Sequence, residues 1–223
     1  MSHTVTIRSI QPVTHDVKQF KVDKPDNFEF IPGQATEVSI DKPDWREKKR
    51  PFTFTGLLEE PDLEFTIKIY EEHEGVTREL DSLNMGDRLI IRDPWGTIEY
   101  QGPGVFLAGG AGITPFIAIL RRLASEESIE GNKLIFSNRT ENDIILEEEF
   151  EAALGENFIN VITDEPTDDY IYQDGFIDKA FLEEQIDDFD QPFYVCGPKG
   201  FNKAILDYLK ELGANPQALV FEK

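Results

Sequence analysis

The first hundred residues contain short runs rich in Val, Ile, Phe and Thr, several of which alternate apolar with polar positions. In the run FTIKIY, the side chains of Phe65, Ile67 and Ile69 fall on one face of an extended strand. Turn signals such as Pro32-Gly33 separate the runs. The pattern predicts strands at Thr4–Ser9, Val17–Val22, Ala35–Ile40, Arg50–Thr55, Leu63–Tyr70 and Arg88–Arg92. Six short strands at this spacing predict a small antiparallel β-barrel or β-sandwich.

After Gly102 the pattern changes to continuous apolar strands that alternate with helical periodicity. Strands are expected at Val105–Ala108, Lys133–Ser137, Phe158–Thr163, Phe193–Cys196 and Ala218–Phe221, and helices near 115–125, 144–154, 178–186 and 199–212. This β-α-β-α order predicts a five-stranded parallel sheet with helices on both faces. The change falls near residues 100–104, so we expect an N-terminal domain over 1–100 and a C-terminal α/β domain over 101–223.

The composition excludes several classes of protein. A formal net charge of −22 argues against a surface that binds nucleic acid. One cysteine excludes an internal disulfide and a cysteine-ligated iron–sulfur cluster, and three scattered histidines predict no metal site. The stretch from Gly102 to Leu120 carries no charge, but its glycines and prolines argue against a membrane span. We expect a soluble cytoplasmic protein.

The strongest local signal is the glycine-rich segment Gly109–Pro115 (GGAGITP), which follows the first parallel strand. Glycines let the backbone turn tightly and approach a ligand closely. Thr114 is a candidate helix cap and Pro115 suits a first helical turn, so the amides and the helix dipole could receive a pyrophosphate. The alternative is a strand–helix turn that simply requires glycine. The spacing differs from the dinucleotide motif G-x-G-x-x-G because proline takes the last position.

Two further segments add candidate chemistry. The run FYVCGP (Phe193–Pro198) is another strand that enters a helix through glycine, so Cys196 would face the same crevice as the glycine loop. A lone cysteine in such a place is by default a small buried apolar residue. In RPFTFT (Arg50–Thr55), an arginine lies near aromatic and hydroxyl side chains that could hold a phosphate and a ring. Taken alone, this run is an ordinary strand.

Together and in this order, the three segments resemble the ferredoxin–NADP reductase superfamily over essentially the whole chain. The flavin motif R-x-[YF]-[ST] of that family is matched by Arg50, Phe52 and Thr53. The resemblance implies that Arg50 contacts the flavin phosphates, Phe52 covers the isoalloxazine and Thr53 hydrogen-bonds near the reactive N5 atom. The family commonly has tyrosine where this chain has Phe52, so a hydroxyl contact is lost.

The resemblance also implies the remaining site residues. The second flavin segment is matched by Ile67, Lys68, Ile69 and Tyr70, followed by Gly75, Val76 and Thr77 for the pyrophosphate, with Thr77 as a candidate helix cap. The nicotinamide-nucleotide site is matched by Gly110, Gly112, Thr114, Pro115, Cys196, Gly197 and Pro198, and it places the thiol beside the nicotinamide. Phe221 and Glu222 resemble the segment that closes over the flavin. Thr53, Cys196 and Glu222 are therefore the catalytic candidates, and Thr53 and Cys196 are expected to converge from the two domains.

The implied activity is hydride transfer from NAD(P)H to bound FAD, followed by electron transfer to a separate carrier such as flavodoxin or ferredoxin. FAD is favoured over FMN by family frequency alone. The alternatives are a free-flavin reductase, the reductase component of an oxygenase, and a nucleotide-sensing or scaffold protein without catalysis. We expect a monomer.

The coenzyme and the docking surface remain open. Ser137 and Arg139 could contact the 2′-phosphate of NADPH, but Arg139 could equally be a surface residue. The segment WREKKR, residues 45–50, carries a net charge of +3 and adjoins the flavin motif. It is either a docking patch for an acidic carrier or a solvated loop.

Overall fold

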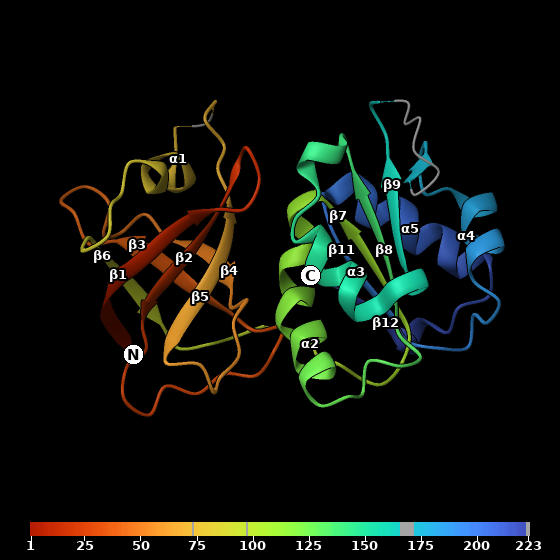
Figure 1. Cartoon of the computed structure of the whole chain (residues 1–223), viewed down its shortest axis with the longest axis horizontal. Coiled ribbons are helices and arrows are strands. Elements are labelled where there is room, and N and C mark those ends of the chain that lie inside the picture. The colour runs from red at the N-terminus through yellow and green to blue at the C-terminus, as the bar shows by residue number, and fades with distance from the viewer. Residues whose placement is uncertain (73, 97, 166–171, 222–223) are drawn as a thin grey trace. The chain divides into compact units, whose positions relative to one another are not determined.

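The computed structural model describes residues 1–72, 74–96, 98–165 and 172–221, and it confirms the predicted fold class. The chain divides into two compact units. The first unit comprises Met1–Gly96 and Thr114–Arg122, and the second comprises Thr97–Ile113 and Leu123–Lys223. Each unit contains one six-stranded sheet (Figure 1).

The sheet of the first unit is antiparallel throughout. Its strands are β1 (Ser2–Pro12), β2 (Val17–Asp23), β3 (Ala35–Ile40), β4 (Arg50–Thr53), β5 (Asp62–Lys68) and β6 (Arg88–Arg92), and one short helix, α1 (Val76–Asp81), lies between β5 and β6 in the sequence. The strand order is β4-β3-β6-β1-β2-β5. A bridge between Phe54 and Phe65 joins the chain just after β4 to β5, so the two outer strands meet and the sheet curls into a nearly closed barrel.

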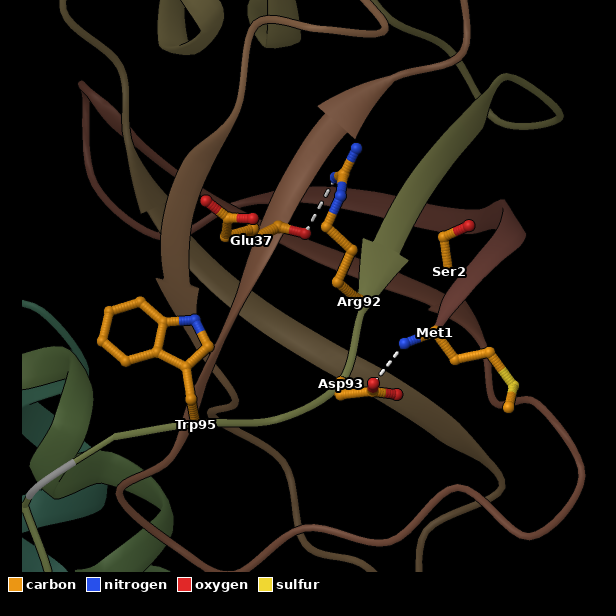
Figure 2. A pocket seen from close by; sticks show the side chains of 6 residues that line it. All are labelled: Met1, Ser2, Glu37, Arg92, Asp93 and Trp95. Carbon is orange, nitrogen blue, oxygen red and sulfur yellow. Dashed lines mark hydrogen bonds and ion pairs between the residues drawn. The ribbon is translucent and has the colours of Figure 1, made fainter.

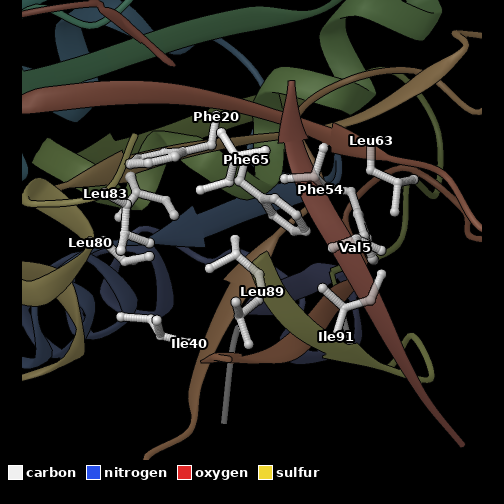
Figure 3. Packing of buried hydrophobic residues seen from close by; sticks show 14 of the residues in the cluster. Val5, Phe20, Ile40, Phe54, Leu63, Phe65, Leu80, Leu83, Leu89 and Ile91 are labelled. Atoms are coloured by element: carbon white, nitrogen blue, oxygen red, sulfur yellow. The ribbon is translucent and has the colours of Figure 1, made fainter. Parts of the chain in front are cut away.

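Aromatic and aliphatic side chains fill the interior of this barrel (Figure 3). Phe54 and Phe65 are fully buried, and Phe54 stacks on Phe30 with ring centroids 4.4 Å apart. The predicted inward face of the run FTIKIY is confirmed, because Phe65, Ile67 and Ile69 are 0%, 1% and 5% exposed. The strand ends at Lys68, and Glu64 and Thr66 on its other face are buried as well. Burial of each large apolar side chain stabilises the barrel by about 1.5–3 kcal/mol. The core therefore holds rigid the two outer strands that carry the candidate flavin residues.

The sheet of the second unit is parallel throughout. Its strands are β7 (Val105–Gly109), β8 (Lys133–Asn138), β9 (Phe158–Ile162), β10 (Tyr172–Asp174), β11 (Phe193–Cys196) and β12 (Leu219–Phe221). The helices of this half of the sequence are α2 (Thr114–Ser125), α3 (Glu147–Leu154), α4 (Lys179–Gln185) and α5 (Lys199–Glu211), with 3₁₀ turns at Gly110–Ile113, Glu141–Asp143, Gly155–Asn157 and Pro216–Ala218. The order β10-β9-β8-β7-β11-β12 reverses at β7, and open parallel sheets bind ligands beyond the strand ends at such a reversal.

Helices cover both faces of this sheet. Val161 and Val195 pack into one apolar cluster with side chains of α4 and α5, such as Leu182 and Ile205. Asn160 belongs to the opposite face, because successive strand residues alternate, and its amide donates to Glu147 of α3 over 3.4 Å. The prediction of helices on both faces is therefore confirmed.

Some details of the sequence prediction were wrong. The parallel sheet has six strands instead of five, because β10 is a three-residue edge strand without an apolar run. The helix expected from residue 144 begins at Glu147, since the preceding Leu146 adopts a left-handed conformation with φ of 56°. The uncharged stretch from Gly102 to Leu120 is divided between β7, a 3₁₀ turn and α2. No helix in the described ranges is long and apolar enough to cross a membrane.

Candidate functional site

The glycine loop and the Cys-Gly-Pro segment meet at the carboxyl end of the parallel sheet. Cys196 of β11 pairs with Ala108 of β7, which directly precedes the loop. A Cβ atom on Gly112 would lie only 2.3 Å from the Cys196 carbonyl oxygen and 2.6 Å from the Gly197 Cα. A Cβ on Gly197 would lie 3.2 Å from the Cα of Gly109. Only glycine allows the two backbones to approach this closely.

The same loop leaves room for a ligand. Gly110 has φ of +51°, and nothing in the described chain lies within 4 Å of the position where its Cβ would stand. The loop forms a 3₁₀ turn, Gly110–Ile113, that runs directly into α2. Thr114 is therefore the first residue of α2 and not its cap, which corrects the sequence prediction, because the 3₁₀ turn occupies the capping position. A backbone with this open glycine surface fits a nucleotide pyrophosphate.

Cys196 ends β11 with its side chain largely inside the protein, at 6% exposure. Gly197 is half-buried and Pro198 is exposed, and α5 begins at the next residue. The segment therefore changes from buried to exposed within three residues. A thiol in this position lies at the end of the strand where a ligand of the open sheet would bind.

At the end of β8, the candidates Ser137 and Arg139 differ in exposure. Ser137 is half-buried, whereas the Arg139 side chain is 80% exposed and its Nε donates to Asp164 over 2.7 Å. This hydrogen bond from Arg139 holds the pKa of Asp164 below its ordinary value. Sequence reasoning missed Asp164, although it directly follows the strand predicted at residues 158–163. The Asp164 carboxylate can accept hydrogen bonds from ribose hydroxyls and would repel a 2′-phosphate.

In the first unit, the Arg-x-Phe-Thr motif forms β4. Arg50 is exposed, and its Nη1 donates to the Lys49 carbonyl over 2.9 Å. Phe52 packs partly against the barrel core, and Thr53 is half-buried and pairs with Ala35 of β3. The motif therefore offers a charged group, a ring and a hydroxyl along one outer strand.

The second flavin segment begins on β5, the outermost strand on the other side of the sheet. Ile67 and Ile69 point into the core, so only their backbone can line a ligand. Lys68 forms an ion pair with Asp16 over 2.8 Å, and Tyr70 is 44% exposed. The two positions that flank Ile69 thus carry a cation and a phenol.

Gly75 is the residue that caps α1, and Val76 is the buried first residue of that helix. Thr77 lies within the first turn, and no side chain caps the helix, so the prediction of Thr77 as the cap was wrong. Gly75 lines a cavity of about 760 Å³ together with Trp45, Lys48 and Arg78. Trp45 comes close to Gly75 only through the folding of the barrel, so the sequence alone does not relate the two residues.

The remaining candidates are at the end of the chain. Phe221 ends β12 and pairs with Val195 of β11. Glu222 lies outside the described residues. The convergence of Thr53 and Cys196 stays a prediction, because these residues belong to different units.

The basic segment at residues 45–50 is partly neutralised by its neighbours. The Nε of Arg46 lies 2.6 Å from an oxygen of Asp41, and the Nζ of Lys49 lies 3.7 Å from an oxygen of Glu37. The Lys48 ammonium lies 4.1 Å from the centroid of the Trp45 ring. The segment therefore presents less net charge than its sequence predicts.

A second cavity of about 450 Å³ lies elsewhere on the first unit (Figure 2). Its lining residues are Met1, Ser2, Glu37, Arg92, Asp93 and Trp95. The Met1 amino group bonds Asp93, and Arg92 donates to the Glu37 carbonyl over 3.2 Å. None of the predicted site residues that the structure describes lines this cavity.

Comparison with known proteins identifies both halves of the chain. The family model of the oxidoreductase FAD-binding domain matches residues 4–100, and that of the oxidoreductase NAD-binding domain matches residues 106–207. These matches, together with the barrel and the glycine-lined parallel sheet, show that the chain consists of the FAD-binding and NAD-binding domains of oxidoreductases. The chain belongs to the ferredoxin reductase-like family of FAD- and NAD-binding oxidoreductases.

Similar proteins include several electron-transfer reductases. The chain is 30% identical over 170 residues to the plasma membrane-associated coenzyme Q6 reductase PGA3 of Saccharomyces cerevisiae, which covers 71% of this chain and 54% of that protein. It is 30% identical over 182 residues to NADH-cytochrome b5 reductase 1 of Dictyostelium discoideum, and the match covers 76% of this chain and 63% of that protein. The chain thus spans less than two thirds of these relatives. The structure of a ferredoxin NADP⁺ reductase from Neisseria gonorrhoeae superposes with a TM-score of 0.84 at 18% identity, covering 99% of this chain and 98% of that chain.

Proposed function

We propose that this protein oxidises NAD(P)H, transfers the hydride to bound FAD and passes the electrons to a separate acceptor. The observation that carries the proposal is the close approach of Gly112 to Cys196 and Gly197, which brings the glycine loop and the Cys-Gly-Pro segment together at the reversal point of the parallel sheet. When bound, FAD supplies a centre that accepts two electrons and releases them singly or in pairs. We assign the FAD-binding domain to residues 1–100 and the NAD(P)-binding domain to residues 101–223.

The barrel residues are proposed to hold the flavin. Arg50 binds phosphate, Phe52 covers the ring and the Thr53 hydroxyl hydrogen-bonds the ring edge. The backbone from Ile67 to Tyr70 lines the ring, and the segment from Gly75 to Thr77 receives the pyrophosphate. The burial of the Ile67 and Ile69 side chains supports this assignment, because only the backbone of these two residues can line a ligand.

The second half of the chain is proposed to hold the nicotinamide nucleotide. Gly110 and Gly112 let the loop backbone approach the pyrophosphate, next to Thr114 and Pro115 at the start of α2. Cys196, followed by Gly197 and Pro198, orients the nicotinamide. Phe221 and Glu222 are proposed to shield the flavin from water.

The test is anaerobic single-turnover reduction of the purified protein. We expect a yellow protein with one FAD per chain whose flavin absorbance is bleached by NADH or NADPH. Cys196→Ala should slow this bleaching while FAD stays bound. If Cys196→Ala is reduced at the wild-type rate in a single turnover, Cys196 is not a catalytic residue. A colourless protein that does not bind added FAD refutes the whole proposal. Weak FAD binding with turnover of added free flavin instead identifies a free-flavin reductase.

We propose NADH as the preferred coenzyme. The guanidinium of Arg139 is engaged by Asp164, and the carboxylate of Asp164 would repel the 2′-phosphate that distinguishes NADPH. Asp164→Asn should therefore raise kcat/KM for NADPH relative to NADH. A wild-type enzyme that prefers NADPH, or a variant with an unchanged ratio, contradicts this assignment.

The proposed acceptor is an acidic carrier protein such as flavodoxin or ferredoxin, docking on the basic segment at residues 45–50. Association of oppositely charged surfaces is steered at long range, whereas the chain as a whole is strongly acidic. The double variant Arg46→Glu, Lys49→Glu should raise KM for the carrier and leave KM for ferricyanide unchanged. Equal effects on both acceptors contradict docking at this segment and favour another partner, such as an oxygenase component.

A further inference from the structure

We infer that the cavity lined by Trp45, Lys48, Gly75 and Arg78 holds the adenosine half of FAD, with the Trp45 indole as the platform for the adenine. This inference rests on the proposed function, and it goes further by assigning the residue that makes the protein select FAD over FMN. FMN lacks the adenosine, so a site for that half discriminates between the two flavins.

The size and lining of the cavity fit a nucleoside. Its volume of about 760 Å³ lies within the range of about 300–1,000 Å³ that small-molecule sites occupy. Trp45 lines the cavity together with two cationic residues, Lys48 and Arg78. Gly75 also lines the cavity, so the cavity adjoins the segment proposed for the pyrophosphate. An adenosine here would be covalently continuous with that pyrophosphate.

The Trp45 ring is held in place but remains accessible to a ligand. The ring packs against the apolar core of the barrel and is only partly buried. Its other partner is the Lys48 ammonium, 4.1 Å from the ring centroid, on an exposed side chain. Stacking of a base on an aromatic side chain is stronger than an exposed cation–π contact. The adenine therefore displaces the ammonium from the ring, and the ammonium is released toward the phosphates.

The acidic side chains of the cavity favour a nucleoside over a free anion. Glu79 is paired with Lys42 over 3.1 Å, and Asp81 with Lys18 over 2.7 Å. Glu71 and Glu74 also line the cavity and are exposed. Glu71 and Glu74 can accept hydrogen bonds from the ribose hydroxyls and from the adenine amino group, which inorganic phosphate lacks.

The experiment measures dissociation constants of FAD and FMN for the apoprotein. Trp45→Ala should weaken FAD binding by about tenfold or more, the range that base stacking supplies, and leave FMN binding unchanged. Trp45→Phe should largely restore the FAD preference. The control is Trp95→Ala, which removes the other tryptophan of the chain, 44% exposed at the cavity of Figure 2, and should alter neither constant.

A second readout does not depend on flavin binding or on the folding of Trp45→Ala. In Trp95→Phe, Trp45 is the one remaining tryptophan, and added ADP should quench its fluorescence while inorganic phosphate should not. An unchanged ratio of FAD to FMN affinity in Trp45→Ala, or no quenching by ADP, overturns the assignment of Trp45 and leaves the proposed function intact. If the wild-type apoprotein binds neither flavin, the proposed function fails, and ADP quenching still decides whether the cavity takes adenosine.

Discussion

Substitution of Gly112 by alanine tests whether the close approach of the two strand ends serves hydride transfer. The added Cβ would lie 2.3 Å from the Cys196 carbonyl oxygen, and real Cβ contacts essentially never fall below 3.0 Å. Because the three atoms nearest to this Cβ are backbone atoms of Cys196 and Gly197, no flexible side chain can move away to relieve the contact. The end of β11 must therefore move by about 0.7–1.1 Å, the difference between 2.3 Å and an ordinary contact of 3.0–3.4 Å.

Two effects of different size follow from this displacement. Overpacking of a close-packed interior costs about 1–3 kcal/mol, which leaves a domain of ordinary stability folded. A displacement of about 1 Å at a reacting group can slow the chemistry by about 10²-fold. We therefore expect Gly112→Ala to remain folded with FAD bound, and to be reduced by NADH about two orders of magnitude more slowly.

The assay is anaerobic stopped-flow reduction at saturating NADH, with thermal unfolding measured in parallel. The matched control is Gly200→Ala near the start of α5, where an added Cβ meets nothing within 4 Å and alanine favours the helix. The control should reduce its flavin at the wild-type rate. If Gly112→Ala, with the substitution verified, reduces its flavin at the wild-type rate, the close approach of Gly112 to the end of β11 does not serve hydride transfer.

Two further predictions concern the second unit. Tyr194→Phe removes a buried hydroxyl that donates a hydrogen bond to the Gly102 carbonyl and accepts one from the Gln101 amide, both over 2.8 Å. We expect the free energy of unfolding to fall by about 1 kcal/mol and Tm to fall by about 2–4 °C. An unchanged Tm in thermal unfolding contradicts this prediction. Burial raises the pKa of the Glu147 carboxyl above its ordinary value of 4.5, and the hydrogen bond from the Tyr172 hydroxyl opposes this shift in part. The folded state therefore binds the proton more tightly than the unfolded state. The free energy of unfolding should fall as the pH rises from the unfolded pKa through the folded pKa. Glu147→Gln keeps an acceptor for Tyr172 and should remove this fall, which urea unfolding from pH 4 to pH 8 measures; parallel pH profiles for the two proteins contradict it.

Local features of the candidate site were predictable because each depends on neighbouring residues. The turn signals, the alternation in β5 and the apolar run of β7 predicted where the strands lie, since strand faces repeat every two residues. The glycine loop was placed correctly after β7 for the same reason. The caps were wrong at Thr77 and Thr114, because the residue that begins a helix depends on how the preceding turn is closed.

Pairs of residues that are distant in the sequence were not predictable in this way. The ion pair of Arg139 with Asp164 joins the ends of two neighbouring strands, and β10 forms only because an adjacent strand offers a partner. Trp45 and Gly75 line one cavity because the barrel brings their two segments together. Nothing in the local sequence of either segment specifies the other.

The sequence by itself determined the class of this protein, namely a barrel of short strands followed by a glycine-lined parallel sheet, with the flavin and nucleotide motifs in order. It could do so because strand periodicity, turn chemistry and motif spacing are short-range properties of the chain. The tertiary structure decided which backbone lies against Gly112, which acid engages Arg139 and which aromatic ring lines the cavity beside Gly75. Those contacts depend on the packing of whole sheets, in which a shift of about 1 Å decides whether a Cβ atom, a carboxylate or an adenine has room.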